Sequence, residues 1–307
     1  MLVWIYAAIG DVAFAEIRDG TAVVNETAST SPIEKNGFLF SIEKNGKKSF
    51  VLGTIHEGFS TEQKLGKNIL DIVDKSSCIF LEVVLGENSH VFLKQSARRH
   101  GGTKLIDLIG EKYFLFFKYM FVDTYSLLTF DDYQTLQPWY IAMLIPIADS
   151  RTENVGRWKF GTEAQLMEIA KGKEIPIEEL EGVEFQTDIF NSMDDHYQSQ
   201  YFNDYVDLVQ DRSIYKREVE AISAWSFSDW EMANKSFIHF STINNIFVEF
   251  YFNHLIKQRN DFLVKKISTI SLRHSSQLFA VGTDHLIGEY GILHQLEKNG
   301  FVIKRIS

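Results

Sequence analysis

The chain has 307 residues, of which 45% are hydrophobic, so it is long enough to bury a large core in one α/β domain. Its formal net charge of -10 and its 31 scattered Lys and Arg residues argue against a nucleic-acid partner, because a phosphate backbone binds basic side chains that replace its counterions. The single cysteine, Cys78, excludes an intramolecular disulfide.

Residues 1–15 form an apolar segment that indicates a possible signal peptide. Such a run is too short to span a bilayer, which takes roughly 20 residues, so we expect no transmembrane helix in the mature chain. Ala13-Phe14-Ala15 has the small-x-small pattern of a signal-peptidase site, which predicts a secreted or periplasmic protein. The absence of a preceding Lys or Arg favours the alternative, a short N-terminal strand in a cytoplasmic protein.

Residues 16–36 are polar and are interpreted as a leader, and a single folded domain is expected over residues 37–307. Near its start, Asn45-Gly46 separates two β-prone runs. Both residues tolerate a positive φ, so this dipeptide predicts a β-hairpin. The second run, Ser49 to Gly53, is apolar throughout and is typical of an interior strand.

A helix and a second buried strand are expected next. Ser60 can cap this helix, and apolar residues repeat at helical spacing from Leu65 onward. The run from Cys78 to Val84 indicates a buried strand, in which a free cysteine behaves as a small hydrophobe. The order strand, helix, strand is that of a βαβ unit and predicts a parallel sheet.

The middle of the chain, from about residue 104 to residue 211, is predicted to be mostly helical. Residues 112–130 are dense in aromatic side chains, but Lys118 and Asp123 interrupt the run, which favours a core helix over a membrane span. Residues 277–306 predict a buried strand, a loop, a helix and an edge strand. We therefore expect an α/β fold with a central mixed, largely parallel sheet and a mostly helical middle insertion.

One short pattern occurs twice, each time at the end of a buried strand: Phe, any residue, an aliphatic residue, Gly, Thr, any residue and His. The two copies end at His56 and His285. Ligands of open α/β sheets bind at this edge, and neutral imidazole is a ligand for Zn, Mn, Co and Fe. We expect neighbouring strands and one metal site. The alternative is that each histidine only caps its strand or fills hydrogen bonds in a buried loop.

A divalent metal also needs a carboxylate or a third imidazole. Glu82 directly follows the apolar run Ile79-Phe80-Leu81, where an unpaired carboxylate is costly to bury. We therefore predict that Glu82 is a metal ligand or a general base. A salt bridge to Lys or Arg is the alternative.

At these residues the sequence resembles the TraB/PrgY/GumN (Tiki-like) family, related to the superfamily of erythromycin esterase and a haem-binding, ChaN-like lipoprotein. The family pattern has Leu-Gly-Thr-x-His near the start and Val-Gly-x-x-His-Leu-x-Gly-x-x-Gly near the end. The chain matches these at Leu52 to His56 and Val281 to Gly291. Between them, five further segments are similar in the same order: Leu81-Glu82, Gln137-Pro138-Trp139, Gly161-Thr162-Glu163, Leu180-Glu181 with Gln186, and Arg259-Asn260.

The chain departs from the family pattern at two places. Glu163 stands where the family commonly has Asp, which keeps the charge but lengthens the arm; it remains a candidate catalytic residue. Lys257-Gln258 precedes Arg259 where an acidic residue is often seen. Any ion pair to Arg259 must therefore come from elsewhere.

The resemblance implies a metal-dependent hydrolase acting on a peptide or a related small polar amide, because family members include inhibitors of peptide pheromones and relatives regarded as divalent-metal proteases. His56, His285 and Glu82 would hold Mn, Co or Zn, which would activate water. Arg259 and Asn260 would stabilise the developing oxyanion. The chain has neither the His-Glu-x-x-His helix of zincins nor the Gly-x-Ser-x-Gly turn of serine hydrolases.

Two other interpretations remain open at this point. A non-catalytic protein could use the same cleft to sequester a peptide, haem or glycan, and it would need the imidazoles but no activated water. The histidine pair could also perform acid–base chemistry without a metal.

Overall fold

A computed structural model of the chain describes residues 35–56, 64–84, 86–99, 101–122, 130–148 and 161–307. The expected signal peptide and nearly all of the expected leader lie outside the described residues.

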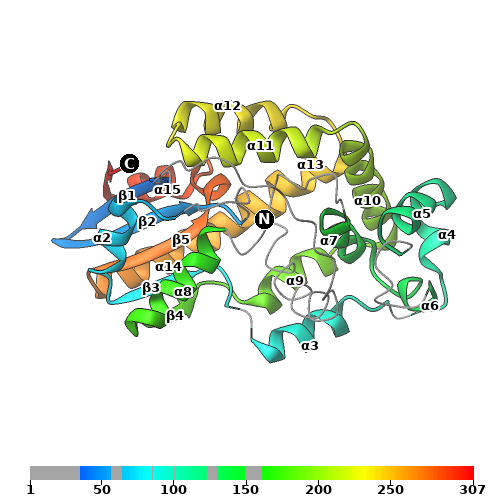
Figure 1. The fold of residues 1–307 in the computed structure, drawn as a ribbon, viewed down its shortest axis with the longest axis horizontal. Helices are drawn as coiled ribbons and strands as arrows, with labels where there is room; N and C mark the ends of the chain where they lie inside the picture. The colour runs from blue at the N-terminus through cyan, green and yellow to red at the C-terminus, as the bar shows by residue number, and fades with distance from the viewer. Residues whose placement is uncertain (1–34, 57–63, 85, 100, 123–129, 149–160) are drawn as a thin grey trace, which may run out of the picture.

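A six-stranded mixed sheet forms one end of the molecule (Figure 1). The strand order is β4-β3-β5-β2-β1-β6; the first four strands are parallel, and β1 pairs antiparallel with both β2 and β6. This confirms the predicted α/β fold with a largely parallel sheet. The strands are β1 Phe38–Lys44, β2 Lys47–Thr54, β3 Cys78–Leu81, β4 Ile177–Glu179, β5 Gln277–Gly282 and β6 Val302–Arg305.

The β1–β2 hairpin forms at the dipeptide that predicted it. Asn45 and Gly46 both have positive φ angles, of 53° and 74°, which suit the tight turn between twisted antiparallel strands. The prediction of an interior β2 is also confirmed, because it lies between β1 and β5 and is buried from Ser49 to Thr54.

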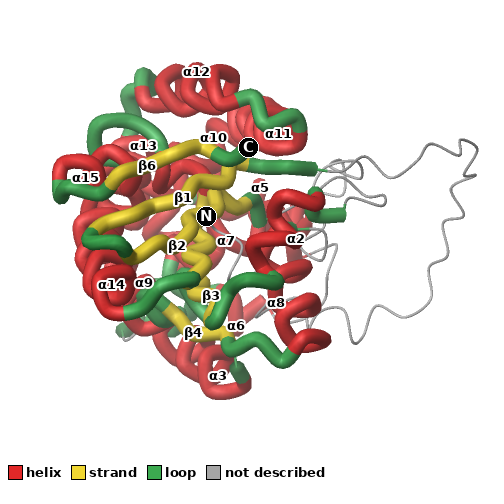
Figure 2. Tube along the Cα trace, turned by 90° about the vertical axis from the view of Figure 1, so that its left-hand side faces the viewer, coloured by secondary structure: helices red, strands yellow, loops and turns green. Residues whose placement is uncertain are grey.

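Helices cover both faces of the sheet, as Figure 2 shows in a view along it. Helices α2 and α8 lie on one face, and α14 and α15 lie on the other. Apolar side chains of all four belong to one buried cluster with those of the strands. These helices are α2 Lys67–Val73, α8 Thr162–Lys173, α14 Arg259–Arg273 and α15 Ile292–Lys298.

Helix α2 starts later than the sequence predicted. Ser60 lies outside the described residues, and Leu65 is not helical: it forms a β-bridge with Lys35, and the Gly66 N–H donates to the Lys35 carbonyl. The helical spacing predicted the buried face correctly, because three aliphatic side chains of α2 are buried.

Cys78 lies on β3 and is buried, as predicted. Burial raises the pKa of its thiol to about 11, so it stays protonated at neutral pH. Only the thiolate form of cysteine is a good nucleophile, so a protonated Cys78 is unreactive. Its role is to pack in the core.

The helical part predicted for the middle of the chain forms a second hydrophobic cluster beside the sheet. Phe114 and Phe117, from the aromatic segment 112–130, are buried in it, which confirms the core-helix interpretation for the described part of that segment. The helices beside the sheet, together called the helical part, extend beyond the predicted range of about residues 104–211 on both sides. They are α3 Glu87–Ser96, α4 Leu105–Ile109, α5 Glu111–Phe117, α6 Phe130–Tyr133, α7 Pro138–Ala148, α9 Val183–Asn191, α10 Asp195–Gln210, α11 Ser213–Ser226, α12 Trp230–Ser241 and α13 Ile246–Phe250, with π-helical segments η1 Lys118–Val122 and η4 Tyr251–Gln258.

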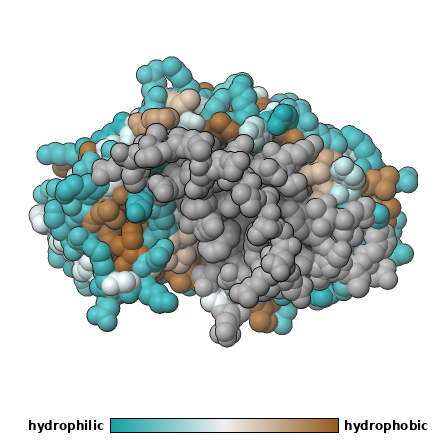
Figure 3. Space-filling view, in the orientation of Figure 1, coloured by the Kyte–Doolittle hydropathy of each residue, from teal (hydrophilic) through white to brown (hydrophobic). Residues whose placement is uncertain are grey.

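The described surface seen in Figure 3 is largely hydrophilic, with hydrophobic atoms showing between the polar ones. Among the described residues, no helix has the length and apolar character needed to cross a membrane.

Candidate functional site

The four parallel strands each lead into a polar residue at the same edge of the sheet. Glu181 follows β4, Glu82 follows β3, His285 lies in a 3-10 turn after β5 (η5, Thr283–Leu286), and His56 follows β2. The predicted neighbourhood of the two histidine-bearing strands is confirmed, because β2 and β5 pair directly, and β3 is the other neighbour of β5.

Gly282 marks the point where three of these side chains meet. A Cβ atom at this position would lie 3.4 Å from Oε1 of Glu82, 3.5 Å from Cδ2 of His285 and 3.7 Å from Nε2 of His56. Groups from three strands therefore surround one small space, into which glycine places no side chain.

The imidazole of His56 contacts the carboxylate of Glu163, which lies in the first turn of α8. Its Nδ1 lies 2.9 Å from Oε1 of Glu163, and the Thr54 hydroxyl donates to the same oxygen at 2.5 Å. Burial would raise the pKa of the Glu163 carboxyl, but His56 and the two hydrogen bonds outweigh it and hold that pKa below its usual value. An ionised Glu163 orients the imidazole so that Nε2 faces away from it.

His285 is held in the same manner by Asn260 of α14. The Asn260 amide nitrogen donates to the carbonyls of His285 and Tyr290, at 3.1 and 2.8 Å, so its oxygen is the atom 2.5 Å from Nδ1 of His285. Nδ1 therefore carries the proton and Nε2 has a free lone pair. Burial lowers the pKa of His285 to about 3, against an opposing effect of Glu82, so the imidazole is neutral.

The Nε2 atom of His285 is buried and has no hydrogen-bond partner. It faces Oε1 of Glu82 at 3.7 Å, so two electron-rich atoms of nearly fully buried side chains point at each other. A cation or a shared proton relieves such an arrangement. Within the described part of the chain, no three His, Cys, Asp or Glu side chains are close enough to form a complete metal site.

Arg259 links the two carboxylates of the neighbouring strands. Its guanidinium lies 2.6 Å from Oε2 of Glu82 and contacts both oxygens of Glu181, at 2.6 to 3.2 Å. The Gly282 N–H donates to the other oxygen of Glu82 at 2.6 Å. The ion pairs that Arg259 was expected to find elsewhere thus come from two strand ends, and Glu82 forms the salt bridge named as its alternative.

The two carboxylates of this network differ in pKa. Burial raises the pKa of Glu181. Burial acts in the same direction on Glu82, but the Arg259 guanidinium and the Gly282 N–H hold the pKa of Glu82 well below its usual range. Glu82 is therefore a stable carboxylate.

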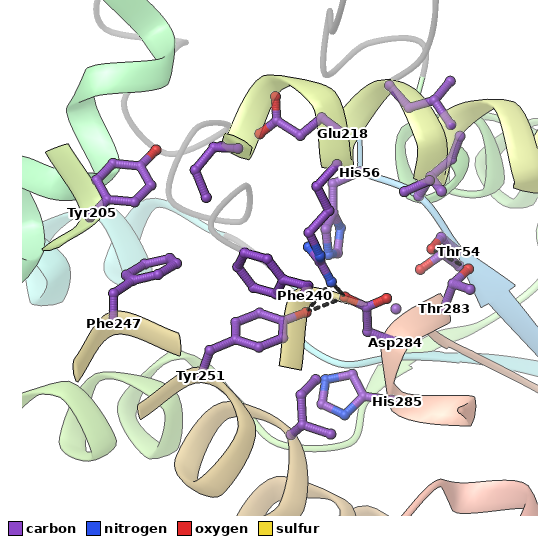
Figure 4. A pocket seen from close by; sticks show the side chains of 17 residues that line it. Thr54, His56, Tyr205, Glu218, Phe240, Phe247, Tyr251, Thr283, Asp284 and His285 are labelled. Atoms are coloured by element: carbon purple, nitrogen blue, oxygen red, sulfur yellow. Dashed lines mark hydrogen bonds and ion pairs between the residues drawn. The ribbon is translucent and has the colours of Figure 1, made fainter. Parts of the chain in front are cut away.

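A cavity of about 150 Å³ opens beside the strand ends, between the sheet and the helical part (Figure 4). Both His56 and His285 line it, which confirms that the two elements share one cavity. The lining residues from the strand ends are Thr54, Ile55, His56, Gly282, Thr283, Asp284 and His285; those from the helical part are Tyr205, Ile214, Arg217, Glu218, Ala221, Ile222, Phe240, Phe247, Tyr251 and Ile256.

Sequence reasoning missed a polar cluster in this cavity. Asp284 accepts hydrogen bonds from Arg217 of α11 and from the Tyr251 hydroxyl, and Arg217 also donates to that hydroxyl at 3.2 Å. Tyr251 begins η4, and π-helical segments are frequent at functional sites. No sequence pattern indicates Arg217. Glu181 was identified only through the family resemblance, although it follows a short strand much as Glu82 does.

Arg259 and Asn260 were expected to stabilise an oxyanion of the substrate, which requires hydrogen-bond donors that face the cavity. Neither side chain lines the cavity, and both are fully engaged with neighbours. The geometry favours a positioning role instead: Arg259 orients Glu82, Asn260 orients His285 and Glu163 orients His56.

Gly53→Ala is expected to destabilise the protein by about 1–3 kcal/mol, the usual cost of overpacking a core. Its Cβ would lie 2.9 Å from a methyl group of Leu286 and 3.0 Å from the Thr283 hydroxyl, so these two buried contacts must rearrange. Urea unfolding measures the loss. Gly102→Ala, where nothing lies within 4 Å of the new Cβ, is the control. Equal stability of the two variants contradicts the close fit of this turn.

Comparisons with known proteins point to one family. No curated protein and no solved structure matches the chain. The model of the TraB/PrgY/gumN family matches residues 38–305, from the first strand of the sheet to the last. The chain belongs to the TraB/PrgY/gumN family.

Proposed function

We propose that this protein is a metal-dependent hydrolase that acts on a peptide or a related amide. The observation that carries the proposal is the buried, unpartnered Nε2 atom of His285, which faces a carboxylate oxygen of Glu82. His285, Glu82 and His56 would hold a divalent ion, for which Mn, Co and Zn are the candidates. Because these three side chains are not close enough to form a complete site as they stand, binding the ion would have to draw them together.

The chemistry of these donors supports a metal. His285 is neutral with its proton on Nδ1, and His56 has a carboxylate behind its own Nδ1, as ligating histidines commonly do. When bound, a divalent ion lowers the pKa of its water toward neutrality and polarises a carbonyl oxygen.

The remaining residues act through the donors. Arg259 and the Gly282 N–H fix both oxygens of Glu82. An efficient general base has a pKa near neutrality, and the pKa of Glu82 is held far lower, so we assign Glu82 as a ligand and not as the base. Asp284 accepts hydrogen bonds from Arg217 of α11 and from Tyr251 of η4. These bonds hold the cavity walls formed by the two helices next to the turn that carries His285.

The proposal is tested by metal content and peptide hydrolysis in the His56→Ala/His285→Ala variant. We expect the purified protein to carry a divalent ion, and the variant to lose both the ion and the activity. A chelator should have the same effect on the original protein, reversed by Mn, Co or Zn. The His239→Ala/His274→Ala variant removes two exposed histidines and should behave as the original protein.

A protein that binds peptide tightly, resists chelator and forms no product with any of these metals would overturn the proposal. That outcome identifies the alternative, a protein that sequesters its ligand in the same cavity.

A further inference from the structure

The cavity has two chemically different ends. In Figure 4, the histidines, Thr54, Thr283 and Asp284 lie toward one side, and aromatic side chains of the helical part lie toward the other. The second end is built mostly from aliphatic and aromatic side chains of α11, α12, α13 and η4. They include Ile214, Ile222, Phe240, Phe247 and Ile256.

The charged side chains between the two ends of the cavity are already paired with other side chains of the protein. Asp284 is paired with Arg217, and the Arg217 guanidinium lies 4.3 Å from the centre of the Phe240 ring. Glu218, the other carboxylate of the helical side, is itself engaged in an interaction. The apolar end therefore offers no uncompensated charge to a charged ligand group, which would lose its hydration there.

The volume of the cavity indicates the size of the ligand group that it can bind. Its volume is about 150 Å³. An engineered cavity of roughly 150 Å³ lined by aliphatic and aromatic side chains binds benzene. A single aromatic or branched aliphatic side chain therefore matches the volume of this space.

We propose that the apolar end of the cavity is a specificity pocket for one Phe- or Leu-like side chain of a peptide substrate. This side chain lies next to the amide that reaches His56 and His285. The inference rests on the proposed hydrolase function for its reaction, and on the cavity lining alone for its binding preference.

The activity test uses four peptides that differ at one residue, Phe, Leu, Gly or Asp, beside the cleaved amide. With metal-loaded protein, kcat/KM should be on the order of 100-fold higher for Phe and Leu than for Asp. Ile214→Trp places an indole in the apolar end and should lower kcat/KM for the Phe and Leu peptides much more than for the Gly peptide.

Ile243→Trp is the matched control. Ile243 is half-buried and packs against the same helical cluster as Ile214, but it does not line the cavity. This variant should keep the preference of the original protein. Equal cleavage of the Phe and Asp peptides, or a loss in Ile214→Trp that is equal for the Gly and Phe peptides, overturns the proposal.

A binding measurement separates this inference from the hydrolase proposal. Calorimetry of N-acetyl-phenylalanine amide and N-acetyl-aspartate amide needs no turnover. Binding of the first and not the second, abolished by Ile214→Trp and kept by Ile243→Trp, supports the pocket even if no peptide is cleaved. No binding of either compound, or equal binding of both, rejects the pocket whatever the activity.

Discussion

Gly282→Ala is expected to lower kcat by about 100-fold or more and to reduce metal content, while the protein stays folded. The new Cβ would stand among Glu82, His285 and His56, at 3.4 to 3.7 Å from each. These are ordinary van der Waals contacts, and the backbone at Gly282 has φ -50° and ψ 138°, a conformation open to alanine. The methyl group therefore fills the space between the donors without straining the chain.

Metal analysis, peptide hydrolysis and thermal unfolding of the same preparation check this result. The Gly102→Ala variant adds the same methyl group in open surroundings and should leave all three measurements unchanged. If Gly282→Ala keeps full metal content and turnover, the space beside Gly282 is not the reaction site.

Glu82→Gln, the obvious alternative substitution, is a less selective test. Both oxygens of Glu82 accept hydrogen bonds, one from Arg259 and one from the Gly282 N–H. The amide nitrogen of glutamine is a donor, so it would face one of these donors in a buried site. A loss of activity would then combine the missing charge with a disrupted network.

Arg259→Met is expected to destabilise the protein by about 3–5 kcal/mol, because removing one partner of a buried ion pair leaves an uncompensated charge. The side chains of Glu82 and Glu181 are only 2% and 0% exposed, and Arg259 is the cation that pairs with both. Urea unfolding measures the loss. Adding Glu181→Gln to Arg259→Met should recover part of it, since one of the two stranded charges is then removed.

A surface ion pair supplies the comparison for Arg259. Lys235 lies 2.7 Å from Glu231, and the two side chains are 74% and 77% exposed. Glu231→Gln should therefore cost much less stability than Arg259→Met, because an exposed ion pair contributes little. A similar cost for Arg259→Met and Glu231→Gln would mean that the buried network contributes no more than a solvated one.

The residues at the sheet edge of this site could be predicted from the sequence, because short sequence patterns place them at the ends of buried strands. An apolar run followed by Gly-Thr-x-His places a histidine at a strand end, and two copies predicted that β2 and β5 are neighbours. The carboxylate of Glu82 was found by the same logic. Buried strands bring such residues together wherever they stand in the chain.

The helical side of the site could not be predicted in this way. Arg217 reaches Asp284 across 67 residues of sequence, and only tertiary packing of α11 over the β5 turn brings them together. The role of Arg259 depends on which way its helix faces. The sequence identified Arg259 and both carboxylates, but not that the two carboxylates pair with this arginine.

The position of β5 has a consequence for how the protein is made. This strand lies between β2 and β3 in the sheet, yet roughly 200 residues separate it from β3, and a ribosome adding about 5–20 residues per second needs on the order of ten seconds or more to reach it. Until then, β2 and β3 lack their shared neighbour and present unpaired edges. A nascent chain therefore already contains His56 and Glu82 but holds them apart. Insertion of this one strand joins β2 to β3 and assembles the site in the same step.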